Sequence, residues 1–293
     1  MGIIVVTRTY NEEDIIEEFL DYYLKNSIDK IMVFDNSSTD KTISLIDEKF
    51  PNNVDIFKFN MKFTDENEEQ HFNLKIYEEV LTEFTSNDKE MIFIFVDVDE
   101  FLFDPKRKDL RDIFKKIWES PHNIFRTVFL EVNPTLSRGD EVYVRLQDLY
   151  KDPIYKYNIL KISKSNFDYF QKLTPTAGYH RWFYNNQLIL NDSECFFLKH
   201  KIFKTIEIGK KRINEKLKLL NHSKTVTYEH YSYILGFLHE QNNQPIYGIL
   251  NQKMINDITT IVNEFDQKSS KYNEIITKNF DNSKRSFNFV DQY

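Results

Sequence analysis

The stretch MIFIFVDVDEFLFDP, residues 91–105, decides the fold, because an apolar run meets a group of carboxylates there. Residues 91–96 are all apolar, and a run of this length is typical of a strand buried on both faces. Asp97, Asp99 and Glu100 follow directly, and the chain then turns apolar again. We expect a core strand whose carboxyl end carries an acidic site, with the next apolar segment returning to the core.

The residues before this stretch alternate between short apolar runs and segments with a helical apolar stripe. The runs expected as strands are 3–7, 30–35, 54–59 and 91–96, and the segments expected as helices are 12–27, 37–50 and 68–86. Such alternation predicts βαβ units and a parallel sheet whose strands end at one shared edge. Ligands bind outside that edge in open α/β sheets. The polar residues after the first, second and fourth strands should therefore meet in one crevice.

The rest of the chain changes character twice. Residues 120–200 contain several strand-like segments and are expected to form a mixed or antiparallel part beside the parallel sheet. Residues 205–293 have mostly helical patterns. We expect one domain over residues 1–204, with halves at 1–104 and 105–204, followed by a mainly helical C-terminal extension.

The composition of the 293 residues excludes several classes of function. The net charge of −7 disfavours general binding to nucleic acid or to anionic membranes. The six glycines form neither G-x-G-x-x-G nor G-x-x-x-x-G-K, which argues against dinucleotide dehydrogenases and P-loop enzymes. Cys195 is the single cysteine, so an internal disulfide and a cysteine zinc site are excluded. No leader pattern or membrane-length apolar run is visible, so we expect a cytoplasmic or membrane-peripheral protein.

The pair Asp97 and Asp99 predicts a metal site. In an extended segment, residues two apart point to the same face. Two carboxylates on one face repel each other unless a cation lies between them, and Mg²⁺ or Mn²⁺ prefers such oxygen ligands. The alternative is a solvated acidic turn after a buried strand.

The ends of the first two strands carry further candidates for ligand binding. Thr7, Arg8, Tyr10 and Asn11 lie at the end of the first strand, and Asp35 ends the second. Tyr10 could stack on a flat ring or simply fill the turn. Asp35 is placed to accept a hydrogen bond from a ligand. Arg8 could pair with Asp35, with the D-x-D carboxylates or with a phosphate.

Three ordered segments carry a resemblance to a known group of enzymes. VVTRTYNEEDIIEEFLDYYL (5–24), IDKIMVFDNSSTDKT (28–42) and IFVDVDEFLF (94–103) resemble the opening of glycosyltransferase family 2 and its relatives with the GT-A fold. The D-x-D-E-F version is similar to a branch that includes family 92, also called domain of unknown function 23. The resemblance implies a Rossmann-like three-layer α/β sandwich, with a nucleotide-binding half before an acceptor half.

The resemblance also implies a substrate and a binding set. Such enzymes use a nucleotide-diphosphate sugar, most often a UDP-sugar, and Mn²⁺ or Mg²⁺. By this analogy Tyr10 and Asp35 hold the nucleobase, Asp97 lies near the ribose or the metal, and Asp99 coordinates the ion that bridges the diphosphate. The full nucleotide-sugar-binding set is then Thr7, Arg8, Tyr10, Asn11, Asp35 and Asp97.

Later segments carry the candidates for the metal, the acceptor and catalysis. FLKHKIFKT contains His200, a further metal or diphosphate contact, and AGYHRWF contains His180 and Trp182, which could line the acceptor site. A reaction that inverts the anomeric carbon needs a carboxylate base. Asp192 and Glu194 lie where the family's base falls, and Glu131 is the competitor. The acceptor would be a glycan, protein or lipid hydroxyl, and helices after residue 205 could serve acceptor recognition or homo-oligomer formation.

Other functions fit the same pattern less well. Haloacid dehalogenase phosphatases carry D-x-D on the first strand with Thr or Val at the fifth position, whereas here it follows the fourth strand and Phe101 stands there. Sugar nucleotidyltransferases use a glycine-rich loop after the first strand, and TRTYNEE has no glycine. A non-catalytic nucleotide-sugar or glycan-binding module would not need paired carboxylates. We therefore expect a metal-dependent glycosyltransferase.

Overall fold

The computed structural model describes most of the first two thirds of the chain and a short part of the remainder. The described residues are 2–60, 66–87, 89–105, 109–131, 143–145, 155–185, 187–189, 195–201, 208, 211, 214, 247–249 and 252–260. The first half comprises β1 (Gly2–Thr9), α1 (Ile16–Lys25), β2 (Lys30–Asp35), α2 (Thr42–Lys49), β3 (Val54–Lys58), α3 (Glu66–Thr85) and β4 (Met91–Phe95). The second half comprises β5 (Glu100–Phe103), α4 (Leu110–Glu119), β6 (Ile124–Glu131), β7 (Tyr143–Arg145), β8 (Tyr155–Ile162), α6 (Phe167–Phe170), β9 (Leu173–Pro175), η1 (Ala177–Tyr179), β10 (Trp182–Tyr184), β11 (Gln187–Leu188), β12 (Cys195–His200) and β13 (Tyr247–Ile249).

One eight-stranded sheet forms the centre of the fold, in the order β3-β2-β1-β4-β8-β6-β12-β5. Strands β1 to β4 are parallel, as predicted. Strand β8 runs antiparallel to both β4 and β6, and β5 runs antiparallel to β12. Strands β8, β6, β12 and β5 thus extend the parallel sheet instead of packing beside it, whereas β9, β10 and β11 form a small three-stranded sheet and β7 lies in a two-stranded sheet with β13.

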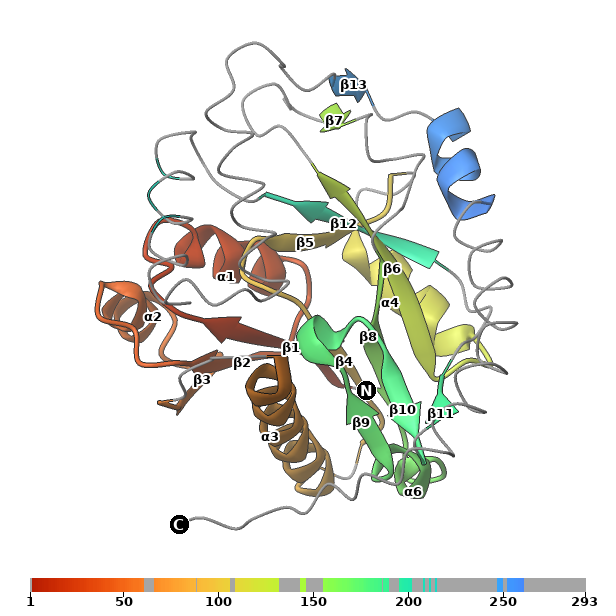
Figure 1. The fold of residues 1–293 in the computed structure, drawn as a ribbon, viewed down its shortest axis with the longest axis horizontal. Coiled ribbons are helices and arrows are strands. Elements are labelled where there is room, and N and C mark those ends of the chain that lie inside the picture. Colours follow the sequence, from red (N-terminus) through yellow and green to blue (C-terminus); the bar gives the residue numbers. More distant parts are fainter. Residues whose placement is uncertain are drawn as a thin grey trace.

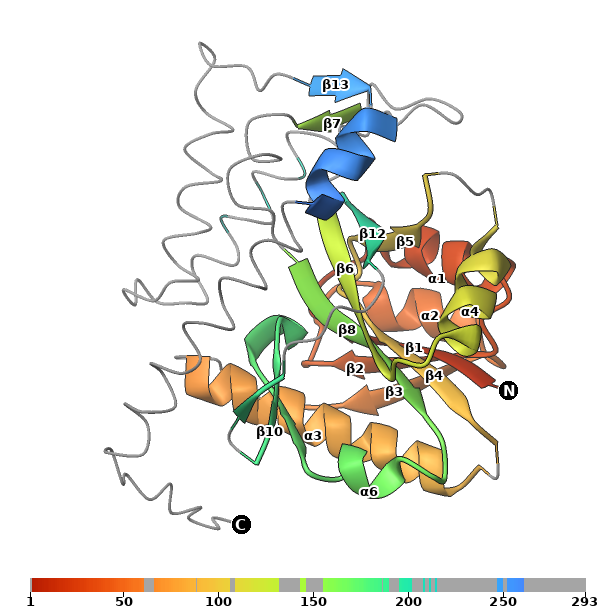
Figure 2. The same ribbon diagram turned by 90° about the vertical axis from the view of Figure 1, so that its right-hand side faces the viewer.

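Helices and the small sheet cover the two faces of the central sheet, which makes three layers (Figures 1 and 2). Alternate residues of β1 enter different cores: Ile3 and Val5 pack with α1, α2 and α4, whereas Ile4 and Val6 pack with α3. This two-sided burial is the reason why the strands read as continuous apolar runs. The predicted α/β three-layer sandwich is confirmed.

The described part of the C-terminal extension is attached to this body. Residues 247–249 form β13, which pairs with β7 in a region whose pattern had predicted helix. Gly248 lies in the middle of this segment, and glycine weakens a helix interior by about 1 kcal/mol relative to alanine. Residues 252–260 are helical, and Met254, Ile255 and Ile258 are buried in the core on the α3 side.

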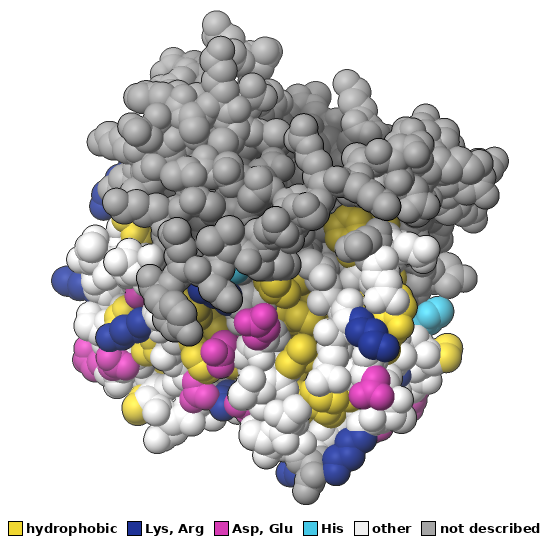
Figure 3. Space-filling view, turned by 60° about the horizontal axis from the view of Figure 1, so that its bottom comes forward, with side chains coloured by type: hydrophobic (Ala, Val, Ile, Leu, Met, Phe, Trp, Pro, Cys, Tyr) yellow, Lys and Arg dark blue, Asp and Glu magenta, His cyan; other side chains and the backbone are white. Residues whose placement is uncertain are grey.

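The described surface is mixed in charge. Figure 3 shows acidic and basic side chains interspersed with apolar ones over one face. Among the described residues, no helix combines the length and apolar character that crossing a membrane requires.

Candidate functional site

The carboxyl ends of β2, β1 and β4 lie side by side, as the sequence predicted. Strand β1 pairs in parallel with both of the others, and Thr9 lies in register with Asp35. The loops after β1 and β2 are tied together, because the Asn11 side-chain oxygen accepts from Thr39 N at 2.7 Å and Asn11 N donates to Ser38 Oγ at 2.9 Å. Asn11 has φ of 55°, a left-handed conformation that Asn tolerates well. Its side chain thus positions the loop that follows β2.

Two candidates for base recognition lie on this edge. Asp35 is buried, and its carboxylate oxygens accept from Ser38 N at 3.2 and 3.3 Å. Tyr10 is half-buried just after β1. Their predicted contacts with a nucleobase stay predictions. Thr7 is different: its side chain is buried and its hydroxyl donates to the Arg8 carbonyl at 3.4 Å, so it offers no exposed group to a ligand.

Arg8 connects β1 to α3 and to the D-x-D segment. Its guanidinium donates to Glu69 Oε1 at 2.8 Å, to Asn73 Oδ1 at 3.2 Å and to Asp97 Oδ1 at 3.2 Å. Pairing with a D-x-D carboxylate was one of the three alternatives for Arg8, and it is the one that the structure contains. Asn73 is fully buried and also donates to the Thr176 carbonyl, which fixes α3 against the segment before η1.

Lys156 on β8 is the buried cation of the site. Its ammonium donates to Glu100 Oε1 at 2.6 Å and to Asp97 Oδ2 at 3.1 Å, and it lies 4.8 Å from the centre of the Phe129 ring. The side chains of Lys156 and Glu100 are only 5% and 2% exposed. Glu100 Oε2 in turn accepts from Asp97 N at 3.1 Å. The three charged side chains therefore form one network that holds the D-x-D segment, in which Lys156 and Glu100 are buried and Asp97 is 36% exposed.

This network shifts the pKa values of its carboxyl groups in opposite directions. Burial is the main reason why the pKa of Glu100 is raised to about 7, and the nearby Asp97 and Asp99 carboxylates raise it too. Lys156 acts to lower this pKa but does not outweigh burial. Burial also acts to raise the pKa of Asp97, but Lys156 and Arg8 outweigh it and hold that pKa well below its ordinary value. Asp97 is thus the permanently ionised member of the pair.

The raised pKa of Glu100 predicts a pH dependence of stability. A carboxyl whose pKa rises from 4.5 to about 7 on folding binds more protons in the folded state, so the free energy of unfolding falls as pH rises from 4.5 through 7. The shift corresponds to about 3 kcal/mol. The lowered pKa of Asp97 has the opposite effect on stability: it stabilises the folded state above pH 3.8, and this contribution is lost as pH falls below 3.8. Urea unfolding at pH 5 and pH 8 measures the slope, which Glu100→Gln should flatten because the amide does not titrate.

The matched control for this pH dependence is Glu119→Gln, on the exposed end of α4. It should keep the slope of the unchanged protein. Equal slopes for Glu100→Gln and the unchanged protein would contradict the raised pKa.

Three side chains on β5, β12 and the turn before β5 form a candidate metal centre. Asp99, Glu100 and His200 each offer a ligand atom, and these atoms lie within 4.8 Å of one another. His200 stands in antiparallel register with Glu100 on β5, and Lys201 N donates to the Asp99 carbonyl at 2.8 Å. The Nε2 atom of His200 lies 3.7 Å from Asp99 Oδ2, which is beyond hydrogen-bond distance. The donors suit a divalent cation, with Asp99 and His200 as direct ligands, since Lys156 and Asp97 N already engage both Glu100 oxygens.

The predicted geometry of the D-x-D pair is wrong. Residues 97–99 form a turn, closed by Glu100 N donating to the Asp97 carbonyl at 3.0 Å, and not an extended segment. Asp97 Oδ1 and Oδ2 contact Arg8 and Lys156, whereas Asp99 lies beside His200. The structure therefore groups Asp99 and His200 with Glu100, and it leaves Asp97 as the ion-pair partner of two cations. The return of residues 100–103 to the core, as buried strand β5, is as predicted.

The residues proposed for the acceptor separate in the structure. His180 is half-buried, and its ring centre lies 6.3 Å from that of Phe129, which lies 5.4 Å from that of His200. The two histidines thus flank one aromatic ring next to the candidate metal centre. Trp182, in contrast, is fully buried against Tyr77, so the expected contact between its indole and an acceptor is not available.

The candidates for the catalytic base are only partly covered by the structure. Asp192 and Glu194 lie outside the described residues. Glu131 ends β6, where its backbone is in register with His200 on the neighbouring strand. Its assignment as a base stays a prediction.

Two residues of the site were missed by reasoning from the sequence. Lys156 comes directly before YNILKISKS (157–165), the segment that the sequence pattern predicts as a strand, so it lay outside that strand. Unlike Arg8, Lys156 is not the single charge on its strand, because β8 also carries Lys161, so its sequence did not mark it as a site residue. Phe129 carried no distinguishing signal, because it is one of several apolar residues on β6.

Comparison with known proteins gives distant structural similarities. The chain matches no protein-family model and no curated protein sequence. Among solved structures it is similar to 4-diphosphocytidyl-2C-methyl-D-erythritol synthase from Anaerococcus prevotii, with 14% identity, 58% of this chain and 74% of that chain covered, and a TM-score of 0.32. It is also similar to HddC from Yersinia pseudotuberculosis, with 11% identity, 68% and 89% covered, and a TM-score of 0.33. A third is glucosyl-3-phosphoglycerate synthase from Mycobacterium tuberculosis in complex with Mn²⁺, UDP and glucosyl-3-phosphoglycerate, with 18% identity, 46% and 45% covered, and a TM-score of 0.27.

Proposed function

We propose that the protein is a metal-dependent glycosyltransferase that moves a sugar from a UDP-sugar to an acceptor hydroxyl. The observation that carries this proposal is the Asp99, Glu100 and His200 cluster at the carboxyl end of β4, beside the ends of β1 and β2. That edge is where open α/β sheets bind ligands. An acidic protein needs a cation to bind an acidic donor, and this cluster offers the ligands for one.

Asp99 and His200 would hold the ion directly, with Glu100 fixing the turn that carries Asp99. A divalent cation bound there would neutralise the negative charge that develops on the diphosphate leaving group. The imidazole of His200 favours Mn²⁺ over Mg²⁺, because Mg²⁺ takes oxygen ligands almost exclusively. Arg8 and Lys156 keep Asp97 ionised and fixed, so the turn is ordered before the donor arrives.

The donor's base would lie between Tyr10 and Asp35. Asp35 is buried at the end of β2 with its carboxylate turned to the loop at Ser38, where an oxygen can also accept from a ring N–H. The half-buried Tyr10 ring supplies a flat surface for stacking. We assign His180, whose ring lies beside Phe129, to acceptor binding. Asp192, Glu194 and Glu131 are the candidates for the base that takes the acceptor proton.

The donor proposal predicts that a UDP-sugar together with Mn²⁺ raises the unfolding temperature. A ligand at a hundred times its Kd stabilises the folded state by about 2.7 kcal/mol. We expect slow release of UDP in the same mixture, and none with EDTA. Thermal-shift and UDP-release assays with UDP-, GDP- and dTDP-sugars measure both effects. Asp35→Asn should weaken the stabilisation, because the buried carboxylate loses its charge.

The outcomes of this experiment separate the competing functions. Asp168→Asn, on the exposed face of α6, is the matched control and should bind donors normally. Stabilisation without hydrolysis or transfer would favour a non-catalytic binding module. Pyrophosphate release from a nucleoside triphosphate and a sugar phosphate would favour a sugar nucleotidyltransferase. If no nucleotide sugar stabilises the protein, the proposal that it binds a nucleotide-sugar donor is wrong.

A further inference from the structure

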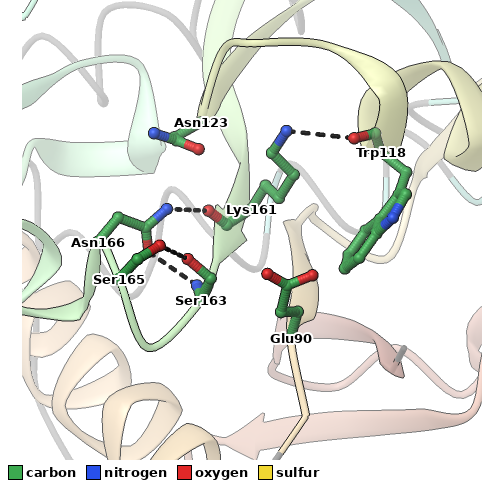
Figure 4. A pocket seen from close by; sticks show the side chains of 7 residues that line it. All are labelled: Glu90, Trp118, Asn123, Lys161, Ser163, Ser165 and Asn166. Atoms are coloured by element: carbon green, nitrogen blue, oxygen red, sulfur yellow. Dashed lines mark hydrogen bonds between the residues drawn. The ribbon is translucent and has the colours of Figure 1, made fainter.

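A polar pocket, drawn in Figure 4, is lined by Glu90, Trp118, Asn123, Lys161, Ser163, Ser165 and Asn166. Glu90 precedes β4, Asn123 precedes β6, and Lys161 lies near the end of the antiparallel strand β8. All three therefore lie where the parallel strands begin. At about 3.3 Å per residue, the strand from Glu90 to Asp97 separates the pocket from the acidic turn by about 20 Å. The pocket thus belongs to a different surface from the proposed donor site.

The frame of this pocket is fixed by hydrogen bonds. Asn166 Oδ1 accepts from Ser163 N at 2.7 Å, and Asn166 Nδ2 donates to the Lys161 carbonyl at 3.2 Å. The Lys161 ammonium donates to the carbonyls of Trp118 and Ser120 at the end of α4. The turn after β8 and the end of α4 are therefore tied together around the hollow. Their positions do not depend on a bound ligand.

Three further side chains line the hollow, beside the hydroxyls of Ser163 and Ser165, which share one hydrogen bond of 2.8 Å. The Glu90 carboxylate and the Asn123 amide make no hydrogen bond within the described part of the chain, although the backbone carbonyl of each accepts one. Figure 4 shows Glu90 and the Trp118 ring on one side of the hollow and Asn123 on the other. The pocket thus combines an acceptor, an amide that both donates and accepts, and an aromatic wall.

We infer that this pocket binds a single sugar ring, as a second carbohydrate site separate from the acidic one. A sugar ring carries hydroxyls that need both donors and acceptors, and its C–H face packs well on an aromatic ring. The volume of about 260 Å³ lies below the range of about 300–1,000 Å³ that drug-sized ligands occupy, which suits one ring. The inference stands independently of the proposed function, since no residue of the acidic site lines the pocket.

Charge separates a sugar from anionic and zwitterionic ligands. An anion would meet the Glu90 carboxylate. A zwitterion such as an amino acid would need the Lys161 ammonium for its carboxylate, but that ammonium already donates to two carbonyls, and burial lowers its pKa. A neutral ligand with many hydroxyls faces neither obstacle.

The test uses the full-length protein and methyl glycosides of hexoses and N-acetylhexosamines. We expect saturation transfer from the protein to at least one glycoside by NMR, with a Kd on the order of 1 mM. The same glycoside should change the tryptophan fluorescence, because the chain has two tryptophans and Trp182 is fully buried. Trp118→Ala should abolish the saturation transfer, and Asn123→Ala should raise the Kd about three- to tenfold.

Controls keep the result specific to the pocket. Lys115→Ala, exposed on the same helix, should bind the glycoside unchanged, and Asn123→Ala serves where Trp118→Ala fails to fold. Stabilisation by UDP-sugar and Mn²⁺ should be the same in Asn123→Ala as in the unchanged protein. No saturation transfer to any glycoside would overturn the inference. So would transfer only to an amino acid or a quaternary ammonium compound, or binding that Trp118→Ala and Asn123→Ala both leave intact.

Discussion

Replacing Asp99 with Asn should lower metal-dependent turnover about a thousandfold while the fold stays intact. The amide keeps the size of the carboxylate but loses the charge that a divalent cation requires, and Asp99 is the member of the D-x-D pair that lies beside His200. The backbone of Asp99 should remain in place, because Lys201 N still donates to its carbonyl. Mn²⁺-dependent release of UDP from the donor measures turnover, and differential scanning calorimetry measures the fold.

Asp47→Asn is the matched control, since Asp47 is exposed on α2. It should leave both turnover and unfolding temperature unchanged. An unchanged rate of UDP release by Asp99→Asn at limiting Mn²⁺ would show that Asp99 is not a metal ligand. A low rate accompanied by a large drop in unfolding temperature would assign Asp99 a structural role instead.

The parallel half of the fold was predictable because its strands are buried on both faces. Runs such as residues 3–7 and 91–96 are apolar throughout, and helices of amphipathic pattern separate them. Parallel strands end at one edge by geometry alone, so the meeting of Arg8, Asp35 and Asp97 at the ends of β1, β2 and β4 followed without knowledge of any contact.

The predictions that were wrong concern features that depend on contacts between residues distant in the chain. The turn at residues 97–99 forms because β5 reverses direction and pairs with β12, which lies about a hundred residues later. Trp182 looked like a sugar-binding ring because it follows His180 and Arg181, but packing against Tyr77 on α3 buries it. Local sequence patterns contain neither the register of β12 nor the position of α3.

Lys156→Met should lower the free energy of unfolding by about 3–5 kcal/mol at pH 8. The Lys156 ammonium is the cation that contacts both Glu100 and Asp97, and Glu100 is only 2% exposed. Methionine has a similar volume, so the change removes charge without opening a cavity. Glu100 is then left as a buried carboxylate without its cation. Urea unfolding at pH 5 and pH 8 measures the loss, which should be smaller at pH 5, where Glu100 is protonated.

A second substitution tests whether charge is the cause. Lys156→Met combined with Glu100→Gln should recover part of the lost stability, because the buried charge at position 100 is gone. Lys75→Met, exposed on α3, should cost little at either pH. An equal loss at pH 5 and pH 8, or no recovery in the double variant, would mean that Lys156 acts through packing. The expected pattern would instead show that the turn carrying Asp99 is held by a buried ion pair, which fixes the candidate metal centre before any ligand binds.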